Sequence, residues 1–315
     1  MREDEDDTPR GSRFGSGLTL GVLGGLVAGV AFGWWAAGGA LPSMPQPAQP
    51  HQAPAAGAAP VQAVTPSVDL NAQALQAAVA ETDPIVIGVF GDSMADGLWA
   101  GLYRQLRDEQ NVRVVRFSRP STGLTRYDYV DVGAQTAEQL AGEPVDIAVF
   151  LIGTNDRQAL QGDGRQALTY GEAEWRAAYA GRVDALADQV RGAGAALYWV
   201  GLPRMRSERA DAGAELVNDI FAGRGRAKGF PFIDTTAATS DESRLYAAYL
   251  PTGPNGRLQL ARANDGIHMT MSGYLRMAEP VAAQIRADLS RARASTQPPA
   301  PPGSIDQAPV VDGAA

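Results

Sequence analysis

The sequence contains no cysteine and only two histidines, His51 and His268. The lack of cysteine excludes disulfide bonds, thiolate metal sites and a cysteine nucleophile. A catalytic zinc would have to be held almost entirely by carboxylates, so we expect no metal and no cofactor. Because His51 lies in a tract rich in proline and alanine, any histidine-dependent catalysis must use His268. With cysteine absent, this composition leaves a side-chain hydroxyl as the candidate nucleophile.

Positive charge is also scarce. The chain has 27 Lys and Arg residues against 35 Asp and Glu residues, which gives a formal net charge of -8. Nothing in the sequence resembles a basic stripe that could release counterions from a phosphate backbone. The sequence therefore argues against nucleic acid as a partner.

An uncharged apolar run, residues 18–37, has the length that a bilayer core requires. Arg10 and Arg13 lie just before this run, and the positive-inside rule then places the N-terminus in the cytoplasm. We expect residues 1–17 to be a cytoplasmic segment and residues 18–40 to be a transmembrane helix that anchors the protein. The remainder would be exported to the periplasm or the extracellular space.

A cleaved signal peptide is the alternative interpretation of this segment, because Ala36, Ala37 and Ala40 offer small residues to a peptidase. The apolar run is longer than the roughly 7–15 residues of a typical signal-peptide core, which favours the anchor. Trp34 and Trp35 lie where an aromatic interface belt would be, which also favours a spanning helix.

Glycine recurs at every fourth position of the apolar segment, so one face of a helix would carry glycine alone. Such a face lets a second helix approach closely, and self-association is one interpretation. The other is that glycine is simply common in spanning helices. The residues concerned are Gly17, Gly21, Gly25, Gly29 and Gly33.

Two segments have compositions that cannot bury a core. Residues 41–69 are rich in proline, alanine and glutamine and are predicted to be a linker. Residues 294–315 have a similar composition and are predicted to be a disordered tail. A single folded domain is therefore expected over residues 70–293.

Within that domain, short apolar runs alternate with amphipathic stretches, which is typical of a parallel sheet covered by helices on both faces. We expect an α/β fold, a three-layer α/β/α sandwich with a central, mostly parallel five-stranded sheet in a flavodoxin-like order. The expected strands are 85–90, 112–117, 145–152, 195–201 and 230–233, and the clearest helices are 95–108, 172–191, 212–222 and 272–291.

Polar residues follow the first and third expected strands. Ser93 comes directly after the first strand and before a helix, and Asn155 follows the third. Since neighbouring strands of this order diverge at the carboxyl edge, Asn155 would face Ser93 across a crevice. Its amide could donate to negative charge on a carbonyl oxygen. The alternatives are structural: Asp92 or Ser93 could cap the helix, and Asn155 could form an Asx turn.

Two further segments fall at the same edge. Gly123 follows the second strand, where a glycine lets the backbone approach a ligand. Asp265 and His268 precede the last helix, and their spacing lets the carboxylate accept from one imidazole nitrogen while the other faces a serine. Taken alone, Gly123 also fits an ordinary turn, Asp265 a helix start and His268 an incidental surface position. Together they indicate serine catalysis, with Ser93 as nucleophile and His268 as base.

The segments Gly91-Asp92-Ser93, Gly123, Gly153-Thr154-Asn155-Asp156 and Asp265-Gly266-Ile267-His268 resemble the four conserved blocks of the SGNH (GDSL-like) hydrolase superfamily. The resemblance covers about residues 85–290. It implies a nucleophile at Ser93 and a base at His268, oriented by Asp265. It also implies an oxyanion hole formed by the N–H groups of Ser93 and Gly123 and the side chain of Asn155.

The first block departs from the pattern in one place, because Met94 stands where the family has leucine. The wider context, including Asn155-Asp156-Arg157-Gln158 and Arg262-Ala263-Asn264, resembles a branch of bacterial envelope proteins known mainly as a domain of unknown function. That second resemblance implies no substrate.

We expect a serine esterase that hydrolyses a short-chain or O-acetyl ester of a small molecule or a glycan in the cell envelope. An O-acetyltransferase acting on an envelope glycan would use the same residues, and a non-catalytic envelope scaffold is the remaining alternative. Residues 246–262, with a turn at Pro254-Asn255-Gly256, are predicted to form a hairpin before the Asp265 loop. This hairpin would shape acyl or leaving-group specificity, or be only a surface feature.

Overall fold

The computed structural model describes residues 69–81, 83–161, 166–252 and 255–296. The predicted cytoplasmic segment, transmembrane helix and linker lie outside these residues, apart from position 69, as does most of the predicted tail. Among the helices that the model describes, none combines the length and the apolar character needed to cross a membrane.

The central sheet has five parallel strands in the order β2-β1-β3-β6-β7. This is the predicted flavodoxin-like order, and all five predicted strands are present; the first two are one residue longer than predicted and the other three are shorter. Since every strand runs the same way, all their carboxyl ends meet at one edge. The strands are β1 (Ile85–Gly91), β2 (Val112–Ser118), β3 (Ile147–Leu151), β6 (Ala196–Val200) and β7 (Phe232–Ile233).

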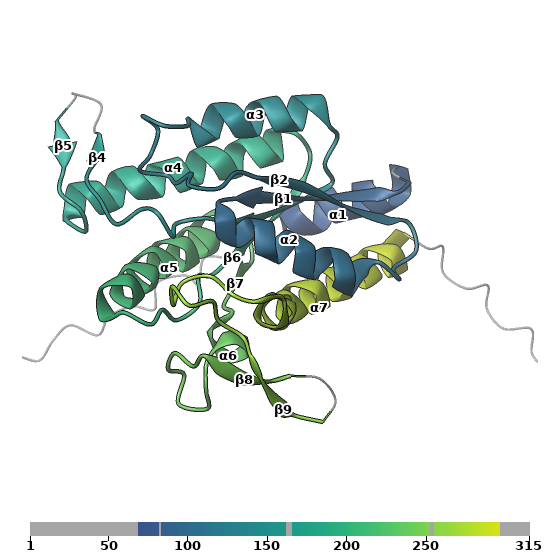
Figure 1. The fold of residues 1–315 in the computed structure, drawn as a ribbon. Coiled ribbons are helices and arrows are strands. Elements are labelled where there is room, and N and C mark those ends of the chain that lie inside the picture. Colours follow the sequence, from purple (N-terminus) through teal and green to yellow (C-terminus); the bar gives the residue numbers. More distant parts are fainter. Residues whose placement is uncertain (1–68, 82, 162–165, 253–254, 297–315) are drawn as a thin grey trace, which may run out of the picture. The chain divides into compact units, whose positions relative to one another are not determined.

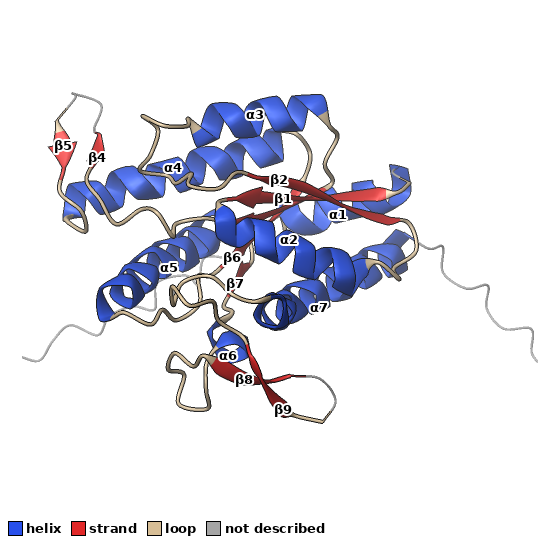
Figure 2. Ribbon diagram, in the orientation of Figure 1, coloured by secondary structure: helices blue, strands red, loops and turns tan. Residues whose placement is uncertain are grey.

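Helices cover both faces of the sheet, which confirms the predicted three-layer sandwich (Figures 1 and 2). On one face α7 packs against both α2 and α1, and on the other α4 packs against both α3 and α5. The helices are α1 (Leu70–Glu81), α2 (Ser93–Leu106), α3 (Val132–Gly142), α4 (Ala173–Gly192), α5 (Glu208–Lys228), the short α6 (Thr236–Thr239) and α7 (Met271–Thr296).

Some observed helices are longer than the predicted ones. Helix α5 begins after Ser207, whose hydroxyl accepts from the Ala210 N–H, and ends at Gly229, whose φ of 72° suits a left-handed cap. Helix α7 continues to Thr296, past the predicted helix end at residue 291, and Ala292 in this extension is still buried. Helices α1, α3 and α6 were not among those predicted.

A row of aromatic rings crosses the sheet one residue before the carboxyl end of β1. Phe117, Phe90, Phe150 and Trp199 are register partners on four adjacent strands. Successive ring centroids are 4.9, 4.9 and 5.1 Å apart, in stacked geometry. Stacked aromatic pairs add to the free energy of burial, so this row fixes the strands together just beneath the edge where the polar segments emerge.

Two small antiparallel hairpins extend from the sandwich. One pairs β4 (Leu160–Gln161) with β5 (Ala167–Leu168), and the other pairs β8 (Tyr249–Thr252) with β9 (Arg257–Leu260). The second is the hairpin predicted from the sequence, and both of its strands contact α7. Its role in specificity remains a prediction.

Candidate active site

Ser93 lies at the carboxyl end of β1, as the first residue of α2. Asp92 is the N-cap, and its carboxylate accepts from the Met94 N–H at 2.9 Å, so Asp92 takes the capping role and Ser93 does not. Gly91 has a φ of 134°, and a Cβ there would lie 1.9 Å from the Leu151 carbonyl oxygen. Only glycine fits this turn, which places the Ser93 hydroxyl at the sheet edge.

Ser93, His268 and Asp265 form a continuous hydrogen-bonded chain. Ser93 Oγ lies 2.7 Å from His268 Nε2, and His268 Nδ1 lies 2.6 Å from Asp265 Oδ2. The other carboxylate oxygen accepts from the backbone N–H groups of Ile267 and His268 at 2.8 and 3.0 Å. The structure thus brings together three side chains that the sequence separates by up to 175 positions.

Asp265 remains ionised at neutral pH. Burial acts to raise its pKa, but hydrogen bonds from the His268 side chain and from the Ile267 and His268 backbone hold that pKa at about 2. An ionised carboxylate only accepts, so Nδ1 of a neutral His268 must carry the proton. Nε2 is then left with its lone pair directed at the Ser93 hydroxyl.

Asn155 and Gly123 lie next to each other at the same edge. One side-chain N–H of Asn155 donates to the Thr122 carbonyl oxygen at 2.8 Å, and an amide nitrogen has a second N–H to give. Gly123 is buried, and within the described residues its backbone N–H has no hydrogen-bond acceptor. The Thr122 hydroxyl donates to the Arg119 carbonyl at 2.7 Å, and the Arg119 N–H donates to the Gly91 carbonyl at 2.8 Å, which ties this loop to the Ser93 turn.

Asp92 joins the serine turn to the Asn155 loop, a role that the sequence analysis did not assign. Besides capping α2, its carboxylate accepts from the Thr154 N–H at 3.1 Å. Burial raises the pKa of Asp92 to about 6, and the nearby Asp156 also raises it. Asp92 is therefore a buried acid at the centre of the site.

Asp156 joins the Asn155 loop to the Gly123 loop in the same way. It accepts from the N–H groups of Leu124 and Thr125 at 3.0 and 2.9 Å and from the Tyr179 hydroxyl at 2.8 Å. A Cβ on Gly123 would lie 2.3 Å from its carboxylate, so glycine is required there. Burial raises the pKa of Asp156. For the loop-joining roles of Asp92 and Asp156, the only signal in the sequence is the presence of an aspartate in each motif.

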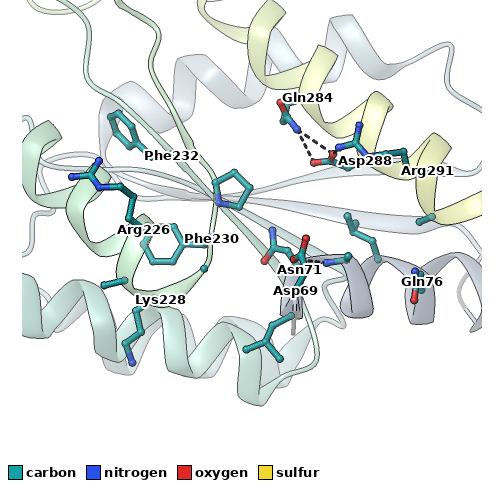
Figure 3. Close-up of a pocket in the computed structure, with 18 of the residues that line it drawn as sticks. Asp69, Asn71, Gln76, Arg226, Lys228, Phe230, Phe232, Gln284, Asp288 and Arg291 are labelled. Carbon is teal, nitrogen blue, oxygen red and sulfur yellow. Dashed lines mark hydrogen bonds and ion pairs between the residues drawn. The ribbon is translucent and has the colours of Figure 1, made fainter. Parts of the chain in front are cut away.

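The predicted site residues are not part of two cavities that lie elsewhere in the described fold. A cavity of about 1020 Å³ lies among α1, α5 and α7, where Asp288 contacts Gln284 and Arg291 (Figure 3). A second, of about 370 Å³, is lined by residues of α5 and the loops after β6 and β7. None of the predicted site residues lines either cavity, and the His268 side chain is 37% exposed.

No group of three or more potential metal ligands is present in the part of the chain that the structure describes. The candidate site is therefore the serine, histidine and aspartate chain together with the donors around it.

The fold and this site define a protein with an α/β/α sandwich and a serine-histidine-aspartate chain at the carboxyl edge of its sheet. The model of a family described as "Protein of unknown function (DUF459)" matches residues 86–284, which is more than half of the chain. The chain belongs to this family, in agreement with the resemblance to a domain of unknown function. Comparison with curated proteins gives no match.

Several solved structures are similar to this chain. An aryl esterase from M. smegmatis is 16% identical, with 64% of this chain and 99% of that chain covered and a TM-score of 0.47. A carbohydrate acetylesterase from Sinorhizobium meliloti is 13% identical, with coverages of 64% and 99% and a TM-score of 0.47. A putative SGNH hydrolase from Slackia heliotrinireducens is 22% identical, with coverages of 64% and 100% and a TM-score of 0.44.

Proposed function

We propose that this protein is a serine hydrolase that cleaves ester bonds, with Ser93 as its nucleophile. The observation that carries the proposal is the unbroken chain from the Ser93 hydroxyl through His268 to an ionised Asp265. A serine hydroxyl is a weak nucleophile until an adjacent base accepts its proton. A non-catalytic scaffold would have no use for a nucleophile, a base and an orienting carboxylate held at these distances.

In the proposed reaction, His268 Nε2 accepts the proton of Ser93 as Oγ attacks the ester carbonyl carbon. Asp265 stays ionised and stabilises the imidazolium that forms. The bond to the leaving alcohol then breaks, and His268 gives its proton to the alcohol oxygen. Water, activated by the same imidazole, attacks the acyl-serine and releases the acid.

The negative charge of the tetrahedral intermediate needs donors beside Ser93. The N–H groups of the first turn of α2 and of Gly123 and the second side-chain N–H of Asn155 supply them in this proposal. The hydrogen bonds that the Asp92 and Asp156 carboxylates accept from backbone N–H groups hold the loops that carry these donors. Little reorganisation of the loops is therefore needed when the charge develops.

The acceptor in the second half of the reaction is water. Ser93 and His268 are both partly exposed, which gives solvent access to an acyl group on Oγ. This exposure favours hydrolysis over transfer to a sugar hydroxyl, since a transferase must exclude water. We propose a short-chain or O-acetyl ester of a small molecule or a glycan as substrate.

We also propose that residues 18–40 anchor the protein in a membrane, with the hydrolase domain on the outer side. The support is the length of the uncharged run and the arginines that precede it. Cell fractionation of the full chain, and of a chain lacking residues 1–40, tests this: the full chain should sediment with membranes and the shortened chain should not. A full chain that stays soluble would contradict the anchor.

The hydrolase proposal is tested by treating the full chain with a fluorophosphonate ester and locating the adduct by mass spectrometry. A single adduct on Ser93 is expected, and Ser93→Ala should abolish it. Ser118→Ala is a matched control, because the Ser118 hydroxyl donates to Asp96 outside the triad and its loss should leave the adduct unchanged. Absence of an adduct on folded native protein would refute an activated nucleophile.

A further inference from the structure

Arg262 is a buried cation close to the candidate site. Its side chain is among the largest fully buried ones, with 1% of the residue exposed, and it lies three positions before Asp265. Burial lowers its pKa. No carboxylate of the described residues lies within ion-pair distance of the guanidinium, although buried arginines usually pair with one. The cost of burying this charge must therefore be offset by other contacts.

Those contacts are mainly backbone carbonyls of the loop that carries His268. Nη1 donates to the carbonyl oxygen of Arg204 at 2.8 Å, and Nη2 donates to that of Ile267 at 2.9 Å and to that of Gly266 at 3.4 Å. The Tyr246 ring lies 4.9 Å from the guanidinium carbon, in a cation–π contact. Gly266 and Ile267 are the two residues between Asp265 and His268.

The loop closes around this guanidinium. The Ala263 N–H donates to the His268 carbonyl at 2.9 Å, and Arg262 forms an antiparallel bridge with Met269. From the outside, Arg206 donates its backbone N–H to the Gly266 carbonyl at 3.0 Å and its side chain to Asn264 at 2.6 Å. The peptide between the proposed base and its orienting carboxylate is thus held from two sides.

We propose that Arg262 is a positioning residue for the His268 base. It holds the Gly266–Ile267 peptide in place, and the imidazole thereby keeps its hydrogen bonds to Asp265 and Ser93. This inference rests on the proposed function, because it assigns the role through the triad. A planar guanidinium can reach Arg204 on one side and Ile267 on the other, whereas a lysine ammonium is a single point and cannot bridge them. Displacement of a catalytic group by about 1 Å costs on the order of 10² in rate.

The test compares Arg262→Lys and Arg262→Met with the parent, all in the full chain carrying His51→Gln, so that His268 is the only histidine. Two quantities are measured in each: the rate at which a fluorophosphonate labels Ser93, and the NMR signal of the imidazole Nδ1 proton held by Asp265. Near-ultraviolet circular dichroism reports whether each variant is folded.

Arg276→Met is the matched control, because Arg276 donates to the carbonyls of Ala238 and Pro251 and, among the described residues, forms no hydrogen bond or ion pair with the Asp265 loop. We expect both Arg262 variants to label about 10–100 times more slowly and to lose or broaden the Nδ1 proton signal. The control should keep both properties even where its thermal stability falls. Since Arg262→Lys retains the charge and most of the volume, it provides a folded variant if Arg262→Met does not fold.

Native labelling and a native Nδ1 proton signal in a folded Arg262 variant would overturn the positioning role. Failure of the proposed function has a different signature, since the parent itself would then remain unlabelled. In that case the Nδ1 proton signal still shows whether Arg262 orients the imidazole. A signal unchanged by either substitution would refute the inference independently of any reaction.

Discussion

Asn155 uses one side-chain N–H to bond the Thr122 carbonyl and has a second to offer a substrate oxyanion. If that second N–H stabilises the transition state, Asn155→Ala should lower turnover of a short-chain ester by roughly 10²–10³, because the lost donor acts mainly on developing charge. Asn155→Asp, which keeps the shape but loses both donors, should have a similar or larger effect. Steady-state kinetics together with a thermal unfolding curve checks this. Full turnover in a folded Asn155→Ala protein would remove Asn155 from the oxyanion hole.

Two kinds of site residue could be predicted from the sequence: those that follow a strand end, and the pair Asp265 and His268, whose spacing before the last helix lets them interact. Ser93 and Asn155 each come a few residues after an apolar run, and parallel strands place such residues at one edge. The roles of Asp92 and Arg262 could not be predicted in this way. Asp92 bonds a backbone N–H 62 positions away, and Arg262 bonds a carbonyl 58 positions away. Those contacts depend on the packing of loops whose paths no local pattern specifies.

Among the elements, β1, β3 and β6 were predictable because each is a short, buried apolar run, whereas β2 carries Arg113 and Arg116 and is recognised by its β-branched residues. Helix α3 was harder, because it buries only Val132 and Thr136 and so shows no apolar stripe. Helix α1 shows no clear apolar stripe, because it buries only two apolar side chains, Leu75 and Ala78, and its third buried residue, Asn71, makes polar contacts. Sequence periodicity detects burial of apolar side chains and does not detect this kind of contact.

The Asn71 side chain links α1 to β6 by forming the two backbone hydrogen bonds that a neighbouring strand would form. It donates to the Leu197 carbonyl at 2.8 Å and accepts from the Leu197 N–H at 3.0 Å. Strand β7 pairs with β6 only at Trp199 and Val200, so among the described residues no strand on this side forms hydrogen bonds with the Leu197 backbone. Asn71→Leu should lower the free energy of unfolding by about 2–4 kcal/mol, because two buried backbone groups lose their partners.

Urea unfolding of the native chain and of Asn71→Leu measures this difference. Gln76→Leu is the control, since Gln76 lies on the same helix but is exposed, and its free energy of unfolding should stay within about 0.5 kcal/mol of the native value. Equal stability of Asn71→Leu and Gln76→Leu would show that α1 is held by its apolar contacts alone.

For the molecule as a whole, the buried and the exposed carboxylates respond to pH in opposite directions. Asp92 has a pKa of about 6 in the folded state, above its ordinary value of 3.8, so between these values the folded chain keeps a proton that the unfolded chain releases. Its contribution to stability is therefore lost as pH rises through that window. Asp265, with a pKa lowered to about 2, contributes stability above pH 3.8 that is lost as pH falls towards 2.

The Asp92 and Asp265 effects occupy separate pH windows, so comparing the native chain with Asp92→Asn measures the effect of Asp92 together with its coupling to the neighbouring Asp156. From about pH 4 to about pH 7, the free energy of unfolding of the native chain should fall relative to that of the variant by roughly 2–3 kcal/mol, since the asparagine has no proton to release. Urea unfolding at several pH values supplies the two curves. Parallel curves across this range would mean that Asp92 is ionised in the folded protein without penalty, and the loops around Ser93 would then be joined by a carboxylate throughout the range.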